Sequence, residues 1–148
     1  MLGLDNFQVL QIENKFPGEI KLAIEKRTNS LVIIRIRSPF YLNNAPNIFN
    51  LKGIVKVLSA IYDNDTQTST IVTEYLQNGN IFPIVKKYLD SNGALHDKMT
   101  PTIRSKIIFG VASILKRLHR NNIVHRKLIN NIYLDNNLEP RIKLSSRS

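Results

Sequence analysis

The chain of 148 residues contains no cysteine and no tryptophan. Without cysteine it can form no disulfide, no thiolate metal site and no cysteine nucleophile. It also has no apolar run approaching the ~20 residues that a membrane-spanning helix needs. Its first residues carry neither a basic leader nor a long apolar stretch, so we expect no signal peptide, no membrane association and a cytoplasmic location.

Hydrophobic residues make up 43% of the chain, which is enough for the packed core of one domain or of part of a larger one. The formal net charge is +10. Such a charge is typical of proteins that bind nucleic acids or acidic membranes. Lys and Arg are spread along the sequence rather than gathered in one basic run. We therefore favour a solvated basic surface and keep a basic nucleic-acid-binding protein as a second alternative.

Five segments have the composition of β-strands, and they cover residues 7–12, 19–24, 31–36, 54–62 and 70–75. The polar turn at 25–30 contains an asparagine and joins the second strand to the third, so the first three strands predict an antiparallel meander. Residues 38–52 contain two prolines and several asparagines, which predicts a disrupted helix.

Two helices are expected after these strands. Residues 81–89 form the first, with Pro83 tolerated in its first turn. Thr100 and Pro101 are a good N-cap and first residue for the second. Apolar residues then recur at helical spacing, namely Ile103, Ile107, Val111, Ile114 or Leu115, and Leu118. We expect this stripe to be exposed and to contact another protein.

Residues 123–135 read I-V-H-R-K-L-I-N-N-I-Y-L-D. This segment resembles the catalytic loop of protein kinases, with the pattern I-[VI]-H-R-D-L-K-x-x-N-I-L-L-D. Lys127 occupies the position of the catalytic aspartate, which in that family accepts the hydrogen bond of the substrate hydroxyl. A lysine ammonium only donates. His125 and Arg126 are remnants of the motif, so the resemblance implies no catalytic residue in this chain.

The sequence I-V-T-E-Y-L at 71–76, followed by Asn-Gly, resembles the hinge of the tyrosine-kinase-like group of serine/threonine kinases. That resemblance makes Thr73 the gatekeeper. It also implies that the carbonyl of Glu74 and the N–H of Leu76 would face an adenine edge.

The remaining ATP-binding motifs are degenerate. The pattern I-G-x-G-x-F-G-x-V falls on residues 12–20 and retains Ile12, Gly18 and Ile20. The motif V-A-I-K falls on residues 32–35, where Ile33 replaces the alanine and Arg35 the lysine. The missing glycines matter because the backbone must come close to the phosphates. The family's glutamate partner for that lysine aligns with Leu42.

The metal-binding residues of the family are altered too. Asn131 corresponds to the asparagine that binds the second Mg²⁺, although the loop is one residue short, and a turn asparagine is an equal alternative. The aspartate of D-F-G aligns with Leu144, which offers no oxygen to a hard cation. We therefore expect no cofactor, and ATP and Mg²⁺ follow from the resemblance alone.

The sequence predicts an α+β, protein-kinase-like fold that is truncated after the catalytic-loop region. An N-lobe sheet with a degraded helix C covers residues 1–73, a hinge 74–80, and the first C-lobe helices 81–148. The predicted function is that of a degenerate kinase-like domain without phosphotransferase activity, acting as a protein-interaction module or having no function. A divergent ATP-dependent serine/threonine kinase is the alternative.

Overall fold

The computed structural model describes residues 3–10, 20–38, 50–90 and 99–144. The chain divides into two compact units. Unit 1 consists of Met1–Phe49 and Lys56–Tyr75, and unit 2 consists of Asn50–Val55 and Leu76–Ser148. The predicted disrupted helix, with Leu42, lies largely outside the described residues.

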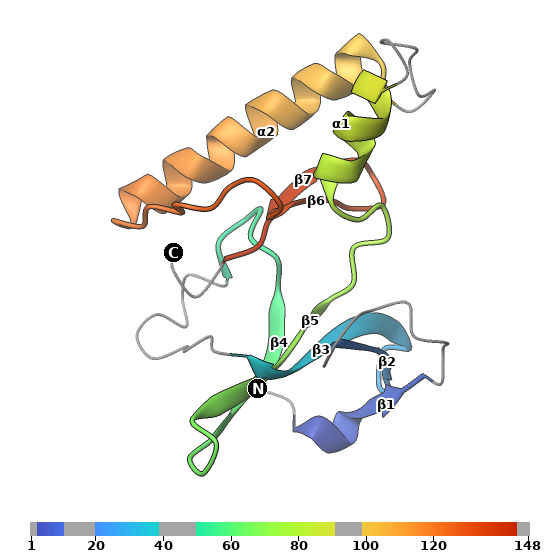
Figure 1. The fold of residues 1–148 in the computed structure, drawn as a ribbon, viewed down its shortest axis with the longest axis vertical. Coiled ribbons are helices and arrows are strands. Elements are labelled where there is room, and N and C mark those ends of the chain that lie inside the picture. Colours follow the sequence, from blue (N-terminus) through green and yellow to red (C-terminus); the bar gives the residue numbers. More distant parts are fainter. Residues whose placement is uncertain (1–2, 11–19, 39–49, 91–98, 145–148) are drawn as a thin grey trace. The chain divides into compact units, whose positions relative to one another are not determined.

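Unit 1 contains a five-stranded antiparallel sheet with the strand order β1-β2-β3-β5-β4 (Figure 1). A short 3-10 helix, η1 (Leu4–Asn6), precedes it. Its strands are β1 (Phe7–Val9), β2 (Ile20–Glu25), β3 (Ser30–Ser38), β4 (Val57–Asp63) and β5 (Thr68–Glu74). The predicted antiparallel meander of the first three strands is confirmed. The predicted fourth strand began too early, because β4 starts only at Val57.

An asparagine with positive φ forms the tight turn between β2 and β3. Asn29, between β2 and β3, has a φ of 56°. Its N–H donates to the carbonyl of Glu25 at 2.8 Å, and the hydroxyl of Thr28 donates to the Glu25 carboxylate at 2.7 Å. Asparagine adopts this left-handed conformation more readily than most residues, which is why the turn falls here.

The sheet has two distinct faces because side chains alternate along each strand. One face carries the core of unit 1, in which Phe7, Ala23, Val32, Ile34 and Val72 are buried together. On the opposite face Ile33 of β3 is paired with Thr73 of β5, and Arg35 is paired with Ile71. The predicted gatekeeper and the residue at the lysine position therefore share one face.

Unit 2 consists of two helices and a hairpin (Figure 1). Its elements are α1 (Ile81–Asp90), α2 (Pro101–Arg120), β6 (Ile132–Leu134) and β7 (Pro140–Ile142). The predicted cap of α2 is confirmed, because the Thr100 hydroxyl accepts a hydrogen bond from the Ile103 N–H at 3.2 Å. The hairpin of β6 and β7 was not predicted, since both strands have only three residues.

The apolar stripe of α2 is covered within unit 2, so our expectation of an exposed stripe was wrong. Ile107, Ile114 and Leu118 are buried. Ile107 packs with Met99 and Leu134, and Ile103 and Val111 lie against the same cluster. The short hairpin supplies the partners that the sequence did not show. The large exposed hydrophobic side chains of α2 are Ile108 and Phe109, with 66% and 74% of their surface accessible.

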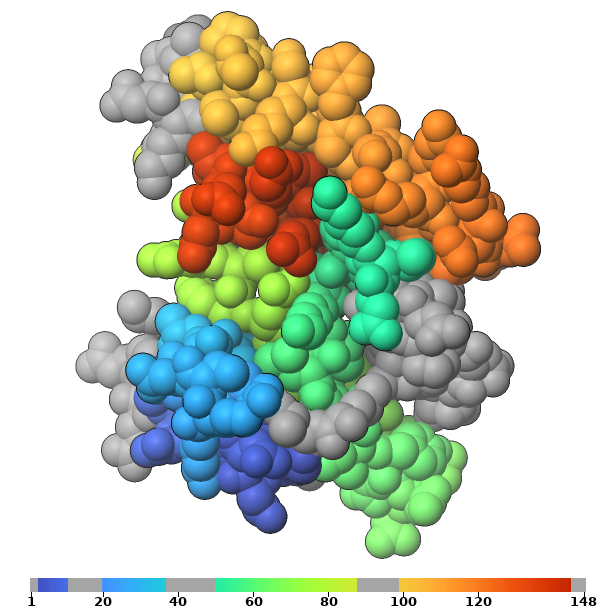
Figure 2. Space-filling model, turned by 180° about the vertical axis from the view of Figure 1, so that it is seen from behind, coloured from blue at the N-terminus to red at the C-terminus, as the bar shows by residue number. Residues whose placement is uncertain are grey.

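The segment 50–55 joins unit 2 through the hairpin and α2. Ile54 forms a parallel bridge with Ile142, and the Val55 N–H donates to the Ile142 carbonyl at 2.9 Å. Gly53 has a φ of 91°, and a Cβ there would collide with Ile114 of α2. Figure 2 shows this segment in teal against the orange α2 and the red β7.

Candidate functional site

The loop that resembles the kinase catalytic loop begins where α2 ends. The N–H groups of Asn121 and Ile123 both donate to the Leu118 carbonyl, at 2.9 Å and 3.0 Å. Between them Asn122 adopts a φ of 59°. A left-handed residue after the last helical turn reverses the chain and satisfies a terminal carbonyl. The loop is thereby directed from α2 back toward β6.

His125 anchors this loop inside unit 2. Only 2% of its surface is accessible. Its Nδ1 accepts a hydrogen bond from the Lys127 N–H at 3.2 Å, and its Nε2 lies 2.7 Å from the carbonyl of Lys143. Since Nδ1 is an acceptor, the proton belongs on Nε2, which then donates to that carbonyl. The histidine of the motif therefore has a structural role in this chain.

Lys127 has a fixed main chain and an exposed side chain. Besides bonding to the His125 ring, its N–H lies 2.9 Å from the His125 carbonyl, and its own carbonyl accepts from Asn131 Nδ2 at 2.7 Å. The preceding Arg126 is exposed and has a φ of 65°. The loop thus presents two cations, one of them where the resemblance implies the catalytic carboxylate.

Asn131 closes the loop. In addition to the bond from its amide nitrogen to Lys127, its N–H donates to the Leu128 carbonyl at 3.0 Å, and its carbonyl accepts from the Lys143 N–H at 2.8 Å. These are the contacts of a turn asparagine, the alternative that we weighed equally. A role for Asn131 in metal binding stays a prediction.

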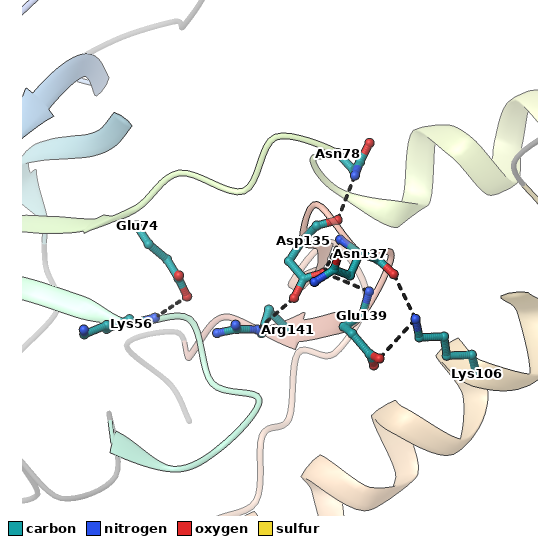
Figure 3. A network of polar contacts seen from close by, with 8 residues as sticks. All are labelled: Lys56, Glu74, Asn78, Lys106, Asp135, Asn137, Glu139 and Arg141. Atoms are coloured by element: carbon teal, nitrogen blue, oxygen red, sulfur yellow. Dashed lines mark hydrogen bonds and ion pairs between the residues drawn. The ribbon is translucent and has the colours of Figure 1, made fainter. Parts of the chain in front are cut away.

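On the sheet of unit 1, the guanidinium of Arg35 donates to the Thr73 hydroxyl, with 3.1 Å between Nη1 and Oγ1. Ile33 and Thr73 are buried beside each other on that face, and Ile20 is the partner of Arg35 on β2. The carboxylate of Glu74 accepts the Lys56 N–H at 2.9 Å (Figure 3). Thr73, the predicted gatekeeper, and Glu74, the predicted adenine-edge residue of unit 1, are thus the last two residues of β5.

Leu76 begins the part of unit 2 that follows β5. It is buried, and its carbonyl accepts from the Gly79 N–H at 2.9 Å. Gly79 has a φ of 69°, so the Asn-Gly pair makes the turn that leads into α1. Ile12 and Gly18 of the predicted phosphate loop lie outside the described residues.

The described residues that the kinase resemblance assigns to the Mg²⁺ and ATP sites do not fit these ligands. In unit 2, Leu144, which the resemblance aligns with the metal-binding aspartate, is 8% exposed, and Lys127 adds a positive charge. A hard cation is bound by carboxylate and carbonyl oxygens, not by these groups. In unit 1, the resemblance aligns Ile33 with the family's alanine, and its larger side chain would take up volume in which a base would pack. Among the described residues, no group of three His, Asp or Glu could hold a metal ion.

A polar network that sequence analysis did not single out organises the hairpin (Figure 3). The Asp135 carboxylate accepts the N–H groups of Asn137 and Glu139 at 2.9 Å and 3.0 Å, and its other oxygen lies 3.6 Å from Arg141 Nε. Asn78 Nδ2 donates to the Asp135 carbonyl at 2.7 Å. The only sequence signal was the polar turn that begins with Asp135.

A second contact of the hairpin reaches α2. Lys106 Nζ donates to the Asn137 carbonyl at 2.9 Å and lies 3.1 Å from a carboxylate oxygen of Glu139 (Figure 3). Asp135 and Glu139 are both engaged with cations of unit 2. Both carboxylates are therefore paired with cations within unit 2, where they stabilise the hairpin and its contact with α2.

Comparison with known proteins agrees with this fold. The sequence matches the profile of the family described as "Protein tyrosine and serine/threonine kinase" over residues 42–146. The chain belongs to this family, and its fold is an α+β arrangement of the elements of a kinase N-lobe and the start of a C-lobe. No helix in the described ranges is long and apolar enough to cross a membrane.

The chain is also similar to a curated mouse protein named "Putative sperm motility kinase W". The two are 27% identical over 122 residues, which cover 75% of this chain. The chain spans only 22% of the length of that relative.

Proposed function

We propose that this chain is a kinase-family domain that does not transfer phosphate and that acts by binding another protein. The observation that carries the proposal is Lys127, whose main chain is held by His125 and Asn131 while its side chain is exposed. The loop thus keeps its internal bonds and presents a cation where the family requires a carboxylate. We further propose a cytoplasmic location, which imaging of the tagged chain tests.

The general base and the metal-binding aspartate of the family, which Lys127 and Leu144 replace in this chain, act on the same chemical step. A positioned general base contributes roughly 10²–10⁴-fold to a reaction rate. The metal-binding aspartate, replaced by Leu144, acts on the same transition state by neutralising developing charge. With both replaced, we expect phosphotransfer to be undetectable.

A transfer assay with labelled Mg-ATP and a generic protein substrate tests the proposal. The wild-type chain, Lys127→Ala and Lys127→Asp are compared with a preparation lacking the protein. We expect all four to give the same background. Transfer by the wild-type chain that is abolished in Lys127→Ala would overturn the proposal and favour a divergent kinase in which Lys127 has a new role.

Nucleotide binding is tested separately by a thermal melt with and without Mg-ATP. A ligand that binds only the native state raises the melting temperature. We expect no shift, because Ile33 and Leu144 replace residues that the family uses around the nucleotide and metal. A concentration-dependent rise would show that the altered site still binds ATP and would remove this part of the proposal.

A further inference from the structure

The turn between β2 and β3 contains a buried carboxylate. Only 5% of the surface of Glu25, the last residue of β2, is accessible. Its Oε2 accepts a hydrogen bond from the Thr28 hydroxyl at 2.7 Å, and its Oε1 lies 3.5 Å from Nε of the exposed Arg27. Among the side chains that the structure describes, Thr28 is the one that donates a hydrogen bond to this carboxylate. A buried charge depends strongly on such a donor.

The turn itself is exposed and positively charged. Residues 26–30 are all exposed, and Lys26 and Arg27 directly precede Thr28. Protein kinases select their acceptor residues partly by the charges beside them, and an acidic substrate groove favours cations just before the acceptor hydroxyl. Thr28 thus combines an accessible position with the charge pattern that a basophilic kinase recognises.

The turn between β4 and β5 provides a contrast within the same sheet. Its Thr66 is also exposed, but it follows Asp63, Asn64 and Asp65. An acidic substrate groove would repel these two carboxylates. Of the two threonines in the exposed turns, the charge pattern therefore selects Thr28.

Two serines also follow an arginine, but both lie in regular elements. Ser105 follows Arg104 inside α2, and Ser38 follows Arg37 in β3, where its backbone is paired with Ser69 of β5. Freeing a residue from a helix of 20 residues or from a paired strand requires more unfolding than opening an exposed turn. The turn between β2 and β3 is the more accessible acceptor.

We propose that Thr28 is phosphorylated by a basophilic serine/threonine kinase and that the phosphate opens the turn. The Thr28 Oγ1 forms a bond to the γ-phosphorus of ATP while the bond from that phosphorus to the bridging oxygen of the β-phosphate breaks. The hydroxyl proton passes to the base of the modifying kinase, and ADP leaves. The inference rests on the proposed function in one respect, since a chain that does not transfer phosphate needs another enzyme for this step.

Phosphorylation removes the contact between Thr28 and Glu25. The modified residue has no hydroxyl hydrogen to donate, and its phosphate brings a charge of about −1.5 to −2 close to the buried carboxylate. The exposed Arg27 offsets only part of this repulsion, because ion pairs at the surface are weak. The phosphate therefore disfavours the closed turn.

Two main-chain hydrogen bonds report whether the turn is closed. The Lys26 N–H donates to the Asn6 carbonyl at 2.9 Å, and the Asn29 N–H donates to the Glu25 carbonyl at 2.8 Å. The first bond joins the turn to the segment that precedes β1, and the second closes the turn itself. We expect both bonds to open more often in the phosphorylated chain.

The first experiment incubates the full chain with labelled Mg-ATP and one of two basophilic enzymes, cAMP-dependent protein kinase or protein kinase C. Mass spectrometry locates the phosphate. We expect at least one enzyme to label mainly Thr28, Thr28→Ser to keep the labelling, and Thr28→Ala to lose most of it. Thr66→Ala, the matched turn variant, should be labelled like the wild-type chain. No labelling by either enzyme, or labelling that persists in Thr28→Ala, would overturn the proposal.

Two double variants test recognition of the turn by its charge. Lys26→Glu with Arg27→Glu should slow the labelling about tenfold or more. Lys86→Glu with Lys87→Glu changes as much charge on the exposed surface of α1 and should change the rate about twofold or less. Equal losses would mean that the enzyme responds to overall charge and not to the turn. Circular dichroism confirms that each variant is folded.

A reaction without added kinase separates this inference from the proposed function. We expect no labelling of the chain by itself. Labelling of Thr28 in that reaction would refute the proposed function, because the chain would transfer phosphate, and would still support Thr28 as the acceptor.

Hydrogen exchange followed by NMR tests the structural effect. We expect the amides of Lys26 and Asn29 to exchange about tenfold or more faster after phosphorylation, and to recover after phosphatase treatment. The Asp65 N–H, which donates to the Asp63 carboxylate at 2.9 Å in the other turn, should be unchanged. Thr28→Val removes the donor without adding charge and should give a smaller increase. Unchanged exchange at both amides, or an equal increase at Asp65, would contradict a local opening by the phosphate.

Discussion

The guanidinium of Arg35 and the hydroxyl of Thr73 are joined by a hydrogen bond of 3.1 Å between neighbouring strands β3 and β5. The two residues are diagonal neighbours, because Arg35 is paired with Ile71 and Thr73 with Ile33. The cation at the position of the family's ATP-binding lysine is therefore directed at the predicted gatekeeper. This bond links β3 to β5 in the sheet of unit 1.

A double-mutant cycle measures this contact. Arg35→Met and Thr73→Val each remove one partner, and we expect a coupling free energy of about 1 kcal/mol in urea unfolding. Thr70→Val is the control, because Thr70 lies on the same strand and faces the other side of the sheet. Its effect should add to that of Arg35→Met. Additivity in the Arg35 and Thr73 pair as well would show that the bond contributes nothing to stability.

The two described histidines make a matched pair for testing the loop anchor. His125 is buried with hydrogen bonds at both ring nitrogens, whereas His119 is exposed on α2. We expect His125→Ala to lower the free energy of unfolding by about 2–4 kcal/mol, since it leaves a cavity and unpaired main-chain groups. His119→Ala should cost less than about 1 kcal/mol. Similar costs for both substitutions would contradict an anchoring role for His125.

The local elements of the fold could be predicted where the sequence carries local signals. Thr100 and Pro101 marked the start of α2, and the asparagine at 29 marked the turn between β2 and β3. In each case the structure depends on a hydrogen bond or a backbone preference of residues that are close together in the sequence. The kinase-like motifs added the order of the elements, which local propensity does not contain.

The remaining features depend on contacts between distant parts of the chain. The pairing of residues 50–55 with β7 joins segments almost 90 residues apart, as the bridge of Ile54 with Ile142 shows. A three-residue strand has no periodicity to read. The apolar stripe of α2 is buried because it packs against this hairpin, which was not predicted either. For the site, the sequence predicted which groups are replaced, but not that His125 and Asn131 hold the main chain of Lys127 in place.

The turn between β4 and β5 gives a pH-dependent prediction. The pKa of Asp63 is lowered from 3.8, because the backbone N–H of Asp65 and then the side chain of Thr66 stabilise its ionised form. A carboxyl group with a lowered pKa contributes stability above its unfolded pKa, and this is lost as the pH falls through the folded value. We expect an NMR titration to give Asp63 a pKa below the ordinary aspartate value of 3.8. Asp63→Asn should remove the part of the pH dependence of stability that Asp63 contributes between neutral and acidic pH. An unchanged pH dependence in this variant would show that Asp63 does not contribute it.

Gly110 tests the close approach of α2 to the hairpin. A Cβ at this position would lie 2.5 Å from Cγ of Pro140, the first residue of β7. In an exposed helix Gly→Ala stabilises by about 1 kcal/mol, but overpacking a contact of this kind costs about 1–3 kcal/mol. We therefore expect Gly110→Ala to lower the free energy of unfolding despite its better helix propensity. Urea unfolding of the purified variant measures the change.

The matched variant is Gly110→Ala combined with Pro140→Ala. Removing the ring of Pro140 takes away the atoms that the new methyl group would meet, so the second substitution should recover most of the loss. Pro140→Ala alone controls for the loss of the proline itself. Helix propensity and packing predict changes of opposite sign in the free energy of unfolding of Gly110→Ala. A stabilised single variant would therefore mean that α2 does not approach β7 as closely as the structure has it. The burial of Ile107 and Leu118 against the rest of unit 2 would then need another explanation.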